Sequence, residues 1–272
     1  EYADATVKQV LDDYSVNYRN TDLAEVARLI SEGKVVHWFR GGSEYGPRAL
    51  GHRSILADPR RAEVKDLLNS TVKHRESFRP FAPAILEEHA ADYFELDRPS
   101  PYMLLIAKVT QPEAIPGVTH VDQTARVQTV NRQDNPGFYD LIEEFHKITG
   151  VPVVVNTSFN DAGEPIVETP LDAAINFLKY RTDYLVFNER ILVDPADNNH
   201  VDVGAMVRER EAAVQADRRR YLKLYCPGYD ESERDYYVGE TNKMAEWHAK
   251  YRSVYELEKK TRQWVEDGTR IV

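Results

Sequence analysis

Two polar stretches of this 272-residue chain carry residue types that bind anionic substrates. The first reads Gly-Pro-Arg-Ala-Leu-Gly-His-Arg over residues 46–53 and places Arg48 and Arg53 among glycines. Glycine lets a backbone approach a ligand closely, and arginine binds phosphate or carboxylate through paired donors. The segment therefore indicates an anion site, although the pattern is only moderately specific by itself.

More cations follow in residues 73–79, where Lys73, Arg75 and Arg79 stand close together. In an extended chain Lys73 and Arg75 would reach the same face. Pro80 and Pro83 indicate irregular or edge backbone here, which is the kind of segment that carries sites. The three cations are therefore candidates for phosphate binding. A run of exposed salt-bridge partners is the alternative.

The second polar stretch follows the apolar run of residues 151–155. Ser158 and Asn160 would share one face if this strand continued beyond Val155. Ligands of α/β proteins usually bind at the carboxyl ends of strands, so both residues are candidates for substrate contact. A helix cap or an Asx-turn at Asn160-Asp161 is the alternative.

Charge is unevenly distributed along the chain. The whole sequence has 35 Lys and Arg against 45 Asp and Glu, which gives a net charge of -10. Residues 34–79, by contrast, contain ten basic residues and five acidic ones. This local excess indicates an anion site, with a solvated basic face as the alternative. Arg126 is a further anion-binding candidate on the same electrostatic argument.

Hydrophobic spacing predicts the elements that must position these residues. Helices are expected over residues 23–30, 58–68, 139–148 and 171–180, and strands over 35–39, 103–110, 151–155, 184–187 and 191–193. Strands that alternate with helices indicate an α/β fold. Residues 1–20 are predicted to be a polar lead-in and 21–196 the main domain. Residues 197–272 are predicted to be a helical extension, with helices over 203–224 and 243–267.

The composition excludes several classes of protein. Hydrophobic residues make up 42% and charged residues 29%, which fits a folded chain better than a disordered one. No apolar run approaches the roughly 20 residues of a membrane span, and the single Cys226 fits a reducing compartment.

The eight histidines lack zinc-like spacing, so we expect no protein metal site. We expect a cytoplasmic protein with no membrane or nucleic-acid partner. The start at Glu1, without a methionine, suggests part of a longer gene product.

Two sets of motifs resemble known enzymes. Lys-x-Arg at 73–75, followed by Ser-x-Asn at 158–160, resembles the motif of the YrdC-like fold, whose members make carbamoyl-type adenylates from ATP. The longer motifs at 46–56, 78–84 and 155–160 resemble the C-terminal domain of the O-carbamoyltransferases, which modify antibiotics, Nod factors and related natural products. The resemblance covers about residues 23–195 and does not reach the tail.

The resemblance implies a twisted α/β sheet with a concave basic face, which forms carbamoyl-adenylate from ATP and carbamoyl phosphate. It assigns Lys73 and Arg75 to the ATP phosphates, and Ser158 and Asn160 to the carbamoyl group or the α-phosphate. Phosphate groups of either substrate would be bound by further arginines: Arg48, Arg53, Arg79 and Arg126. Magnesium (Mg2+) would enter on the oxygens of ATP.

The resemblance also implies a partner. In the family, an actin-like N-terminal domain with a histidine-bound metal such as iron (Fe) transfers the carbamoyl group to a hydroxyl. Nothing in this chain matches that domain, so we expect the adenylating half alone. The identity of the hydroxyl acceptor is not given by this half, and a homodimer is compatible with the sequence.

Two other functions are consistent with the same motifs. One is a threonylcarbamoyl-adenylate synthase of tRNA modification. The motifs at residues 46–51 and 156–160 favour the carbamoyltransferases over this enzyme. The other is a non-catalytic RNA-binding module on a YrdC-like surface, which the net charge of -10 disfavours.

Overall fold

The computed structural model describes residues 2–74, 76, 79–161 and 163–225. By its internal contacts the chain divides into two units, residues 1–210 and 211–272. The first unit contains the sheet and all the described candidate residues. The predicted helix over 243–267 lies outside the described residues.

The first unit is built on one mixed sheet with the strand order β1-β9-β8-β2-β3-β7-β4-β6-β5. Most neighbours are antiparallel, but β2 pairs with β8, and β4 with β6, in parallel. The strands are β1 (Arg19–Asn20), β2 (Val36–Phe39), β3 (Arg53–Ala57), β4 (Ala82–Leu86), β5 (Leu105–Lys108), β6 (Thr124–Val130), β7 (Val153–Ser158), β8 (Tyr184–Phe187) and β9 (Ile191–Val193).

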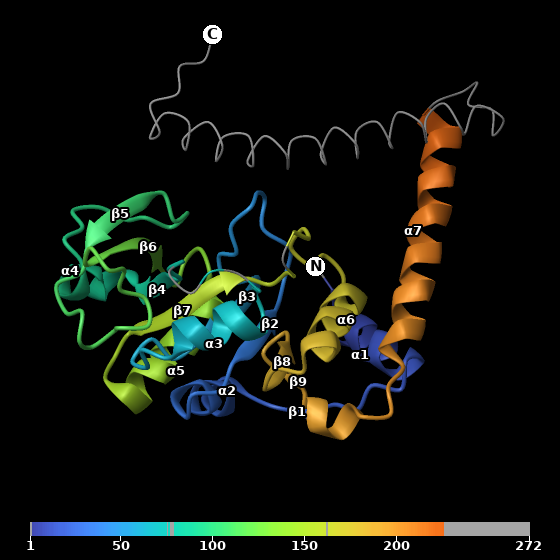
Figure 1. Cartoon of the computed structure of the whole chain (residues 1–272), viewed down its shortest axis with the longest axis horizontal. Coiled ribbons are helices and arrows are strands. Elements are labelled where there is room, and N and C mark those ends of the chain that lie inside the picture. Colours follow the sequence, from blue (N-terminus) through green and yellow to red (C-terminus); the bar gives the residue numbers. More distant parts are fainter. Residues whose placement is uncertain (1, 75, 77–78, 162, 226–272) are drawn as a thin grey trace, which may run out of the picture. The chain divides into compact units, whose positions relative to one another are not determined.

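Helices cover both faces of this sheet (Figure 1). The helices that the structure describes are α1 (Asp4–Asp13), α2 (Leu23–Ser31), α3 (Val64–Thr71), α4 (Ala90–Tyr93), α5 (Pro136–Thr149), α6 (Pro170–Tyr180) and α7 (Val203–Tyr225), with short 3-10 turns at Glu87–His89 and Pro195–Asn198. Those that pack on the sheet through the two core clusters include α1, α3 and α6 on one face and α2 and α5 on the other. The predicted α/β class is therefore confirmed, and the predicted helix over 203–224 corresponds to α7.

The valines of β7 show why the central strands read as continuous apolar runs. Val153 and Val155 pack into one core cluster together with residues of α1, α3 and α6. Val154, between them, packs into the other cluster with residues of α2 and α5. Since side chains alternate across a strand, a sheet covered on both faces buries every position. All three valines have no exposed surface.

The helix predictions are confirmed where the sequence offers a cap. The Asp22 side chain accepts a hydrogen bond of 2.8 Å from the backbone N–H of Glu25 and so begins α2. Asn135 caps α5 in the same way, and α6 begins with a capping box between Thr169 and Asp172. Such caps satisfy backbone donors that would otherwise lack a partner in the helix.

Several segments differ from the sequence expectation, and the strands β1, β3, β4 and β6 were not predicted at all. Residues 4–13 form α1 instead of a lead-in, because Val7 and Leu11 are fully buried in the core. Helix α3 begins at Val64, since the carboxylate of Asp58 accepts hydrogen bonds from Arg60 and holds a turn before it. Pro83 lies in β4 between two other strands, where pairing with β6 begins only at Ala84.

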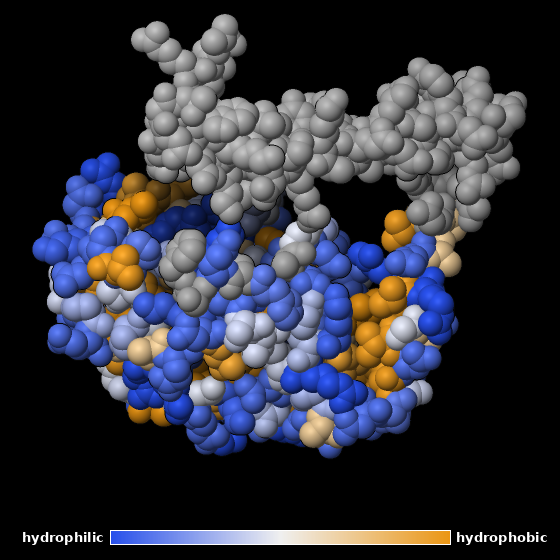
Figure 2. All heavy atoms as spheres, viewed as in Figure 1, coloured by the Kyte–Doolittle hydropathy of each residue, from blue (hydrophilic) through white to orange (hydrophobic). Residues whose placement is uncertain are grey.

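The far edge of the sheet exposes apolar side chains. Leu104 is 78% exposed, and Ile106 of the edge strand β5 is 71% exposed. Ile106 is the cross-strand partner of Arg126 in β6, so the two residues share one face. Figure 2 shows that the visible surface is otherwise mainly hydrophilic, with scattered apolar patches. Within the described residues, no helix has the length and apolar character to cross a membrane.

A tight loop precedes β3 and depends on Gly51. Its φ angle is +103°, in the left-handed region that favours glycine, and an added Cβ would clash with the ring of Phe138. The Gly51 carbonyl accepts a hydrogen bond of 2.9 Å from the indole of Trp38. This glycine therefore lets the loop lie against α5.

We expect Gly51→Ala to reduce the free energy of unfolding by about 2–5 kcal/mol, because left-handed strain and overpacking add. Gly150→Ala is the matched control, since Gly150 ends α5 with φ +74° and an added Cβ would meet nothing within 4 Å. That variant should lose only about 1–2 kcal/mol. Urea unfolding of both variants measures the difference, and equal losses would contradict the clash.

Candidate active site

The ammonium group of Lys73 binds the polar end of β7. Its Nζ atom donates to the backbone oxygens of Ser158 at 2.5 Å and of Asn160 at 3.1 Å. It also lies 2.7 Å from Asn160 Oδ1 and 3.3 Å from Ser158 Oγ. Ser158 Oγ in turn donates to Asn160 Oδ1 at 2.7 Å. The structure thus brings three predicted residues into one hydrogen-bonded group, which we call the lysine cluster.

The backbone reaches this arrangement without the predicted extended strand at Lys73. Lys73 directly follows α3, and its N–H donates to the Leu68 carbonyl as a helix end does. His74 then takes a φ angle of +44°, which turns the chain. The expectation that Lys73 and Arg75 alternate along a strand is therefore wrong for Lys73, because a helix end provides its position. Arg75 lies outside the described residues.

A cavity of about 100 Å³ adjoins the lysine cluster at Ser158. Arg48, from the loop before β3, and Arg126, from β6, both line it. Burial lowers the pKa of Arg126, and the nearby charge of Arg48 lowers it further. No carboxylate is among the described residues that line this cavity: Pro47, Arg48, Ala49, Pro80, Phe81, Ala82, Met103, Arg126, Asn156, Thr157 and Ser158. The cavity therefore offers positive charge to an anion.

Arg53 and Arg79 lie elsewhere. Arg53 has no exposed surface; its Nη1 donates to the carbonyl of Arg40 at 2.7 Å, and its guanidinium lies 3.5 Å from the centre of the Phe39 ring. Arg79 is exposed and pairs with Glu76 at 3.0 Å. Arg53 also donates to the Gly41 carbonyl at 3.3 Å and so stabilises the turn there. The structure therefore brings neither Arg53 nor Arg79 to the cavity.

Asn160 satisfies part of both sequence interpretations. Its side-chain oxygen accepts from Lys73 and Ser158, while its Nδ2 donates to the carbonyl of Glu164 at 2.7 Å. The amide thus closes the turn over residues 160–164 and also presents an oxygen to the lysine cluster. The alternative of a purely structural turn therefore retains support.

His37 lies beneath the lysine cluster and was not a sequence candidate. It is fully buried on β2, with its ring 4.5 Å from the ring of Phe159 and 5.5 Å from that of Phe177. Neither ring nitrogen has a hydrogen-bond partner among the described residues. Burial lowers the pKa of His37 to about 3, and the charge of Lys73 contributes in the same direction. The imidazole is therefore neutral at pH 7.

Three more residues that the sequence did not single out take part in holding the loop that carries Arg48, and one of them, Asn156, also lines the cavity. Asn156 Nδ2 donates to the Ala49 carbonyl at 3.0 Å and to Gln128 Oε1 at 2.7 Å. Gln128 Nε2 donates to the Leu50 carbonyl at 2.9 Å. Glu44 binds backbone N–H groups of the same loop. Asn156 could have been identified from the sequence, because it is a polar residue at the end of an apolar run. Nothing in the sequence distinguishes Gln128.

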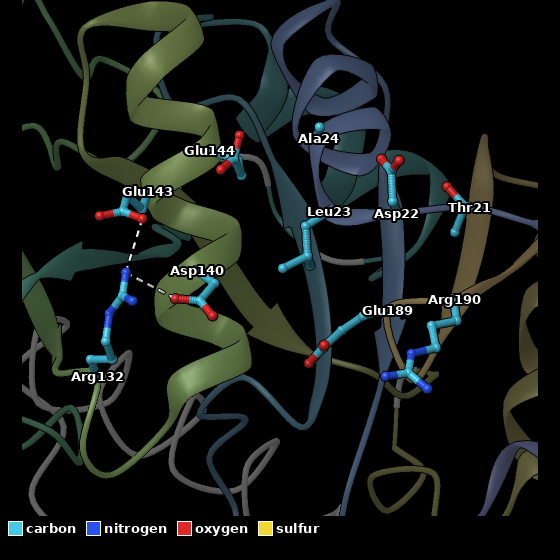
Figure 3. Close-up of a pocket in the computed structure, with 10 residues that line it drawn as sticks. All are labelled: Thr21, Asp22, Leu23, Ala24, Arg132, Asp140, Glu143, Glu144, Glu189 and Arg190. Carbon is cyan, nitrogen blue, oxygen red and sulfur yellow. Dashed lines mark hydrogen bonds and ion pairs between the residues drawn. The ribbon is translucent and has the colours of Figure 1, made fainter.

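A larger hollow of about 670 Å³ lies away from the lysine cluster, beside the start of α2 and along α5 (Figure 3). In it Arg132 lies 3.1 Å from Asp140 and 2.9 Å from Glu143. Carboxylates dominate its wall: Asp22, Asp140, Glu143, Glu144 and Glu189. This charge is unfavourable for phosphate. Across the part of the chain that the structure describes, no three His, Cys, Asp or Glu side chains are grouped to hold a metal ion.

Comparison with known proteins adds a family. Residues 27–194 match the family described as Carbamoyltransferase C-terminus. An uncharacterized protein of Synechocystis is 44% identical over 218 residues, covering 72% of this chain and 35% of that protein. Nodulation protein NolO of Bradyrhizobium diazoefficiens is 49% identical over 174 residues, covering 62% of this chain and 32% of that protein. The chain thus spans about a third of the length of these relatives.

Among solved structures, full-length HypF in a phosphate- and nucleotide-bound form is similar to 62% of this chain and 25% of its own. The TM-score is 0.45 and the sequence identity 23%.

We expect the buried His37 to make folding stability depend on pH. Its pKa is lowered on folding, so the unfolded state binds more protons and stability falls as pH decreases below about 6.5. Between pH 7 and pH 5 this group should cost about 2 kcal/mol. Urea unfolding at both pH values should show that loss in the wild type and a correspondingly smaller loss in His37→Leu. An unchanged pH dependence would contradict this role.

Proposed function

This chain belongs to the carbamoyltransferase C-terminus family, and we propose that it is the adenylating part of an O-carbamoyltransferase. Its substrates would be ATP and carbamoyl phosphate. Hydrolysis of carbamoyl phosphate would yield carbamate and phosphate. A carbamate oxygen would then attack the α-phosphorus of ATP, the bond from that phosphorus to the bridging oxygen would break, and pyrophosphate would leave with the electron pair. The product is carbamoyl-adenylate.

The observation that carries this proposal is the cavity that Arg48 and Arg126 line beside the lysine cluster. Phosphoryl transfer needs positioned cations more than covalent chemistry, because charge is spread over phosphate oxygens in the transition state. Both arginines would bind phosphate oxygens. Among the described residues neither guanidinium has an ion-pair partner, so both charges are available to a ligand.

The lysine cluster would act next to these arginines. Ser158 lines the cavity and also contacts Lys73, so its hydroxyl connects the two groups. We assign Ser158 and Asn160 to the carbamoyl group or the α-phosphate, and Lys73 to a phosphate oxygen that displaces one of its present neutral acceptors. Arg75 stays assigned to the ATP phosphates, as the resemblance implies. Arg53 and Arg79 receive no role here, because Arg53 is buried and Arg79 pairs with Glu76 on the surface.

Magnesium fits this site only as part of the nucleotide. The described cavity wall has no carboxylate to bind it. A metal bound to substrate oxygens would neutralise part of the phosphate charge. Transfer of the carbamoyl group to a hydroxyl of a natural product would fall to the portion of the longer relatives that this chain does not match.

The first test removes a cavity charge without touching the core. We expect Arg48→Ala to reduce pyrophosphate release from ATP and carbamoyl phosphate about 100- to 1000-fold, the usual loss when one positioned charge group is removed. Arg132→Ala is the matched control, because Arg132 lies in the acidic hollow of Figure 3. It should keep the wild-type rate. Release stimulated by threonine and bicarbonate in place of carbamoyl phosphate would instead support a threonylcarbamoyl-adenylate synthase.

The second test separates catalysis from turn formation at Asn160. If its amide contacts substrate, Asn160→Ala should lower pyrophosphate release steeply while the melting temperature changes little. If it mainly closes the turn to Glu164, the variant should lose about 1 kcal/mol of folding stability, as a lost cap typically costs. Both quantities should be measured on the same preparation at 20 °C. A lower melting temperature with a near-normal rate would defeat the catalytic assignment.

A further inference from the structure

The loop over residues 46–53 carries Arg48 and is tied to the protein mainly through its backbone. Asn156 and Gln128 bind the carbonyls of Ala49 and Leu50, and Asn135 adds a third bond to Leu50 at 3.2 Å. These bonds hold the carbonyl side of the loop against β6, β7 and α5. The Gly51 N–H donates to Ser54 Oγ at 3.0 Å, and the amides of Leu50, His52 and Arg53 share another partner.

That partner is the carboxylate of Glu44. Its Oε1 atom accepts hydrogen bonds from the backbone N–H of Leu50 at 2.7 Å, His52 at 3.0 Å and Arg53 at 3.1 Å. Three converging N–H groups form a concave anion site in the backbone, and hydrogen bonds to a charged acceptor are about twice as strong as neutral ones. Glu44 therefore closes the loop on itself.

The negative charge of Glu44 acts on two buried basic side chains beside the loop. Burial lowers the pKa of Arg53, and the charge of Glu44 opposes that shift. Burial likewise lowers the pKa of His52, and Glu44 again opposes it. The carboxylate thus compensates the cost of burying a positive group beside the loop.

Arg48 needs such a constraint because its surroundings repel it. It faces the like charge of Arg126 across the cavity, and among the described residues no hydrogen bond or ion pair holds its guanidinium. An exposed arginine without a partner would turn toward solvent to separate the two charges. The direction of the Arg48 side chain therefore depends on the backbone of its loop. Glu44 binds that backbone at Leu50, two residues after Arg48.

We propose that Glu44 is a positioning residue, which fixes the loop over residues 46–53 so that Arg48 faces the cavity beside Arg126. The proposal deepens the proposed function and rests on it for the role of Arg48. Glu44 acts through the loop backbone and does not touch the substrate.

The first measurement is hydrogen exchange of individual amides, which does not depend on activity. The amides of Leu50, His52 and Arg53 should exchange slowly in the wild type and at least about 10-fold faster in Glu44→Leu, since each loses its acceptor. Glu63→Leu is the matched control, because the Glu63 side chain is 71% exposed and forms a 3.9 Å ion pair with Arg61, away from the loop. That control should leave the three amides unchanged. Unchanged exchange in Glu44→Leu would overturn the proposal.

The second measurement is a double-mutant cycle on pyrophosphate release. If Glu44 acts through Arg48, Glu44→Leu should reduce kcat/KM at least 10-fold alone but by less than about 2-fold in the Arg48→Ala background. Glu44→Gln should recover most of the activity, because its amide oxygen still accepts the three bonds. Equal losses in both backgrounds, or no recovery in Glu44→Gln, would show a general structural role and overturn the proposal.

Two results separate this inference from the proposed function. A wild type without pyrophosphate release counts against the proposed function, and amide exchange then decides on the loop alone. An active wild type that Glu44→Leu does not impair counts against the role of Glu44. Should Glu44→Leu fail to fold, Glu44→Ala, which also removes the acceptor of the three bonds, carries both measurements with the same expected results.

Discussion

The bonds of the Lys73 ammonium to the end of β7 are the constraint on which the candidate site depends. They join a helix end to a strand end that lies 85 residues further along the chain. A buried ammonium is costly unless oxygens surround it, and Ser158 and Asn160 supply four. The requirement works in both directions, since those oxygens also need a donor. Lys73, Ser158 and Asn160 therefore hold one another in place. This also fixes the position of Ser158 in the wall of the neighbouring cavity.

The arginines are held by a different means, which leaves their charge available. Amides from Asn156, Gln128 and Asn135 and the carboxylate of Glu44 bind the backbone of the Arg48 loop and not its guanidinium. Position and charge are thus provided by different atoms. A salt bridge would have supplied position at the expense of charge, as it does for Arg79 and Glu76 on the surface.

The fold was largely predictable from sequence, and the site only in part. Apolar runs and caps predicted β2, β5, β7, β8 and β9 and the helices α2, α5 and α6, because periodicity and the Asp22 cap are local signals. Strands β1, β3, β4 and β6 were not predicted, since polar residues, prolines or turn-forming residues interrupt or flank their sequences. Lys73, Ser158 and Asn160 could be grouped only through the resemblance, since their contact depends on the order of the sheet. The burial of Arg53 was not predictable, because an arginine beside glycines looks the same whether it faces a ligand or a phenylalanine ring. Glu44 and Gln128 gave no signal, as their partners are backbone atoms whose positions only the fold defines.

The place of β3 next to β7 has a consequence for synthesis on the ribosome. Residues 54–57 pair with 155–158, so the strand that carries the arginine loop has to wait for a partner roughly 100 residues later. At elongation rates of about 5–20 residues per second this delay lasts roughly 5–20 s. During that time the N–H and C=O groups on one side of β3 lack their final neighbour. Pairing two strands so far apart in sequence is slow, because the entropy of closing the intervening loop is lost before the strands make contact. The centre of the sheet should therefore form after the local helices. This chain is therefore most exposed to wrong strand pairing while the residues between β3 and β7 are being synthesised.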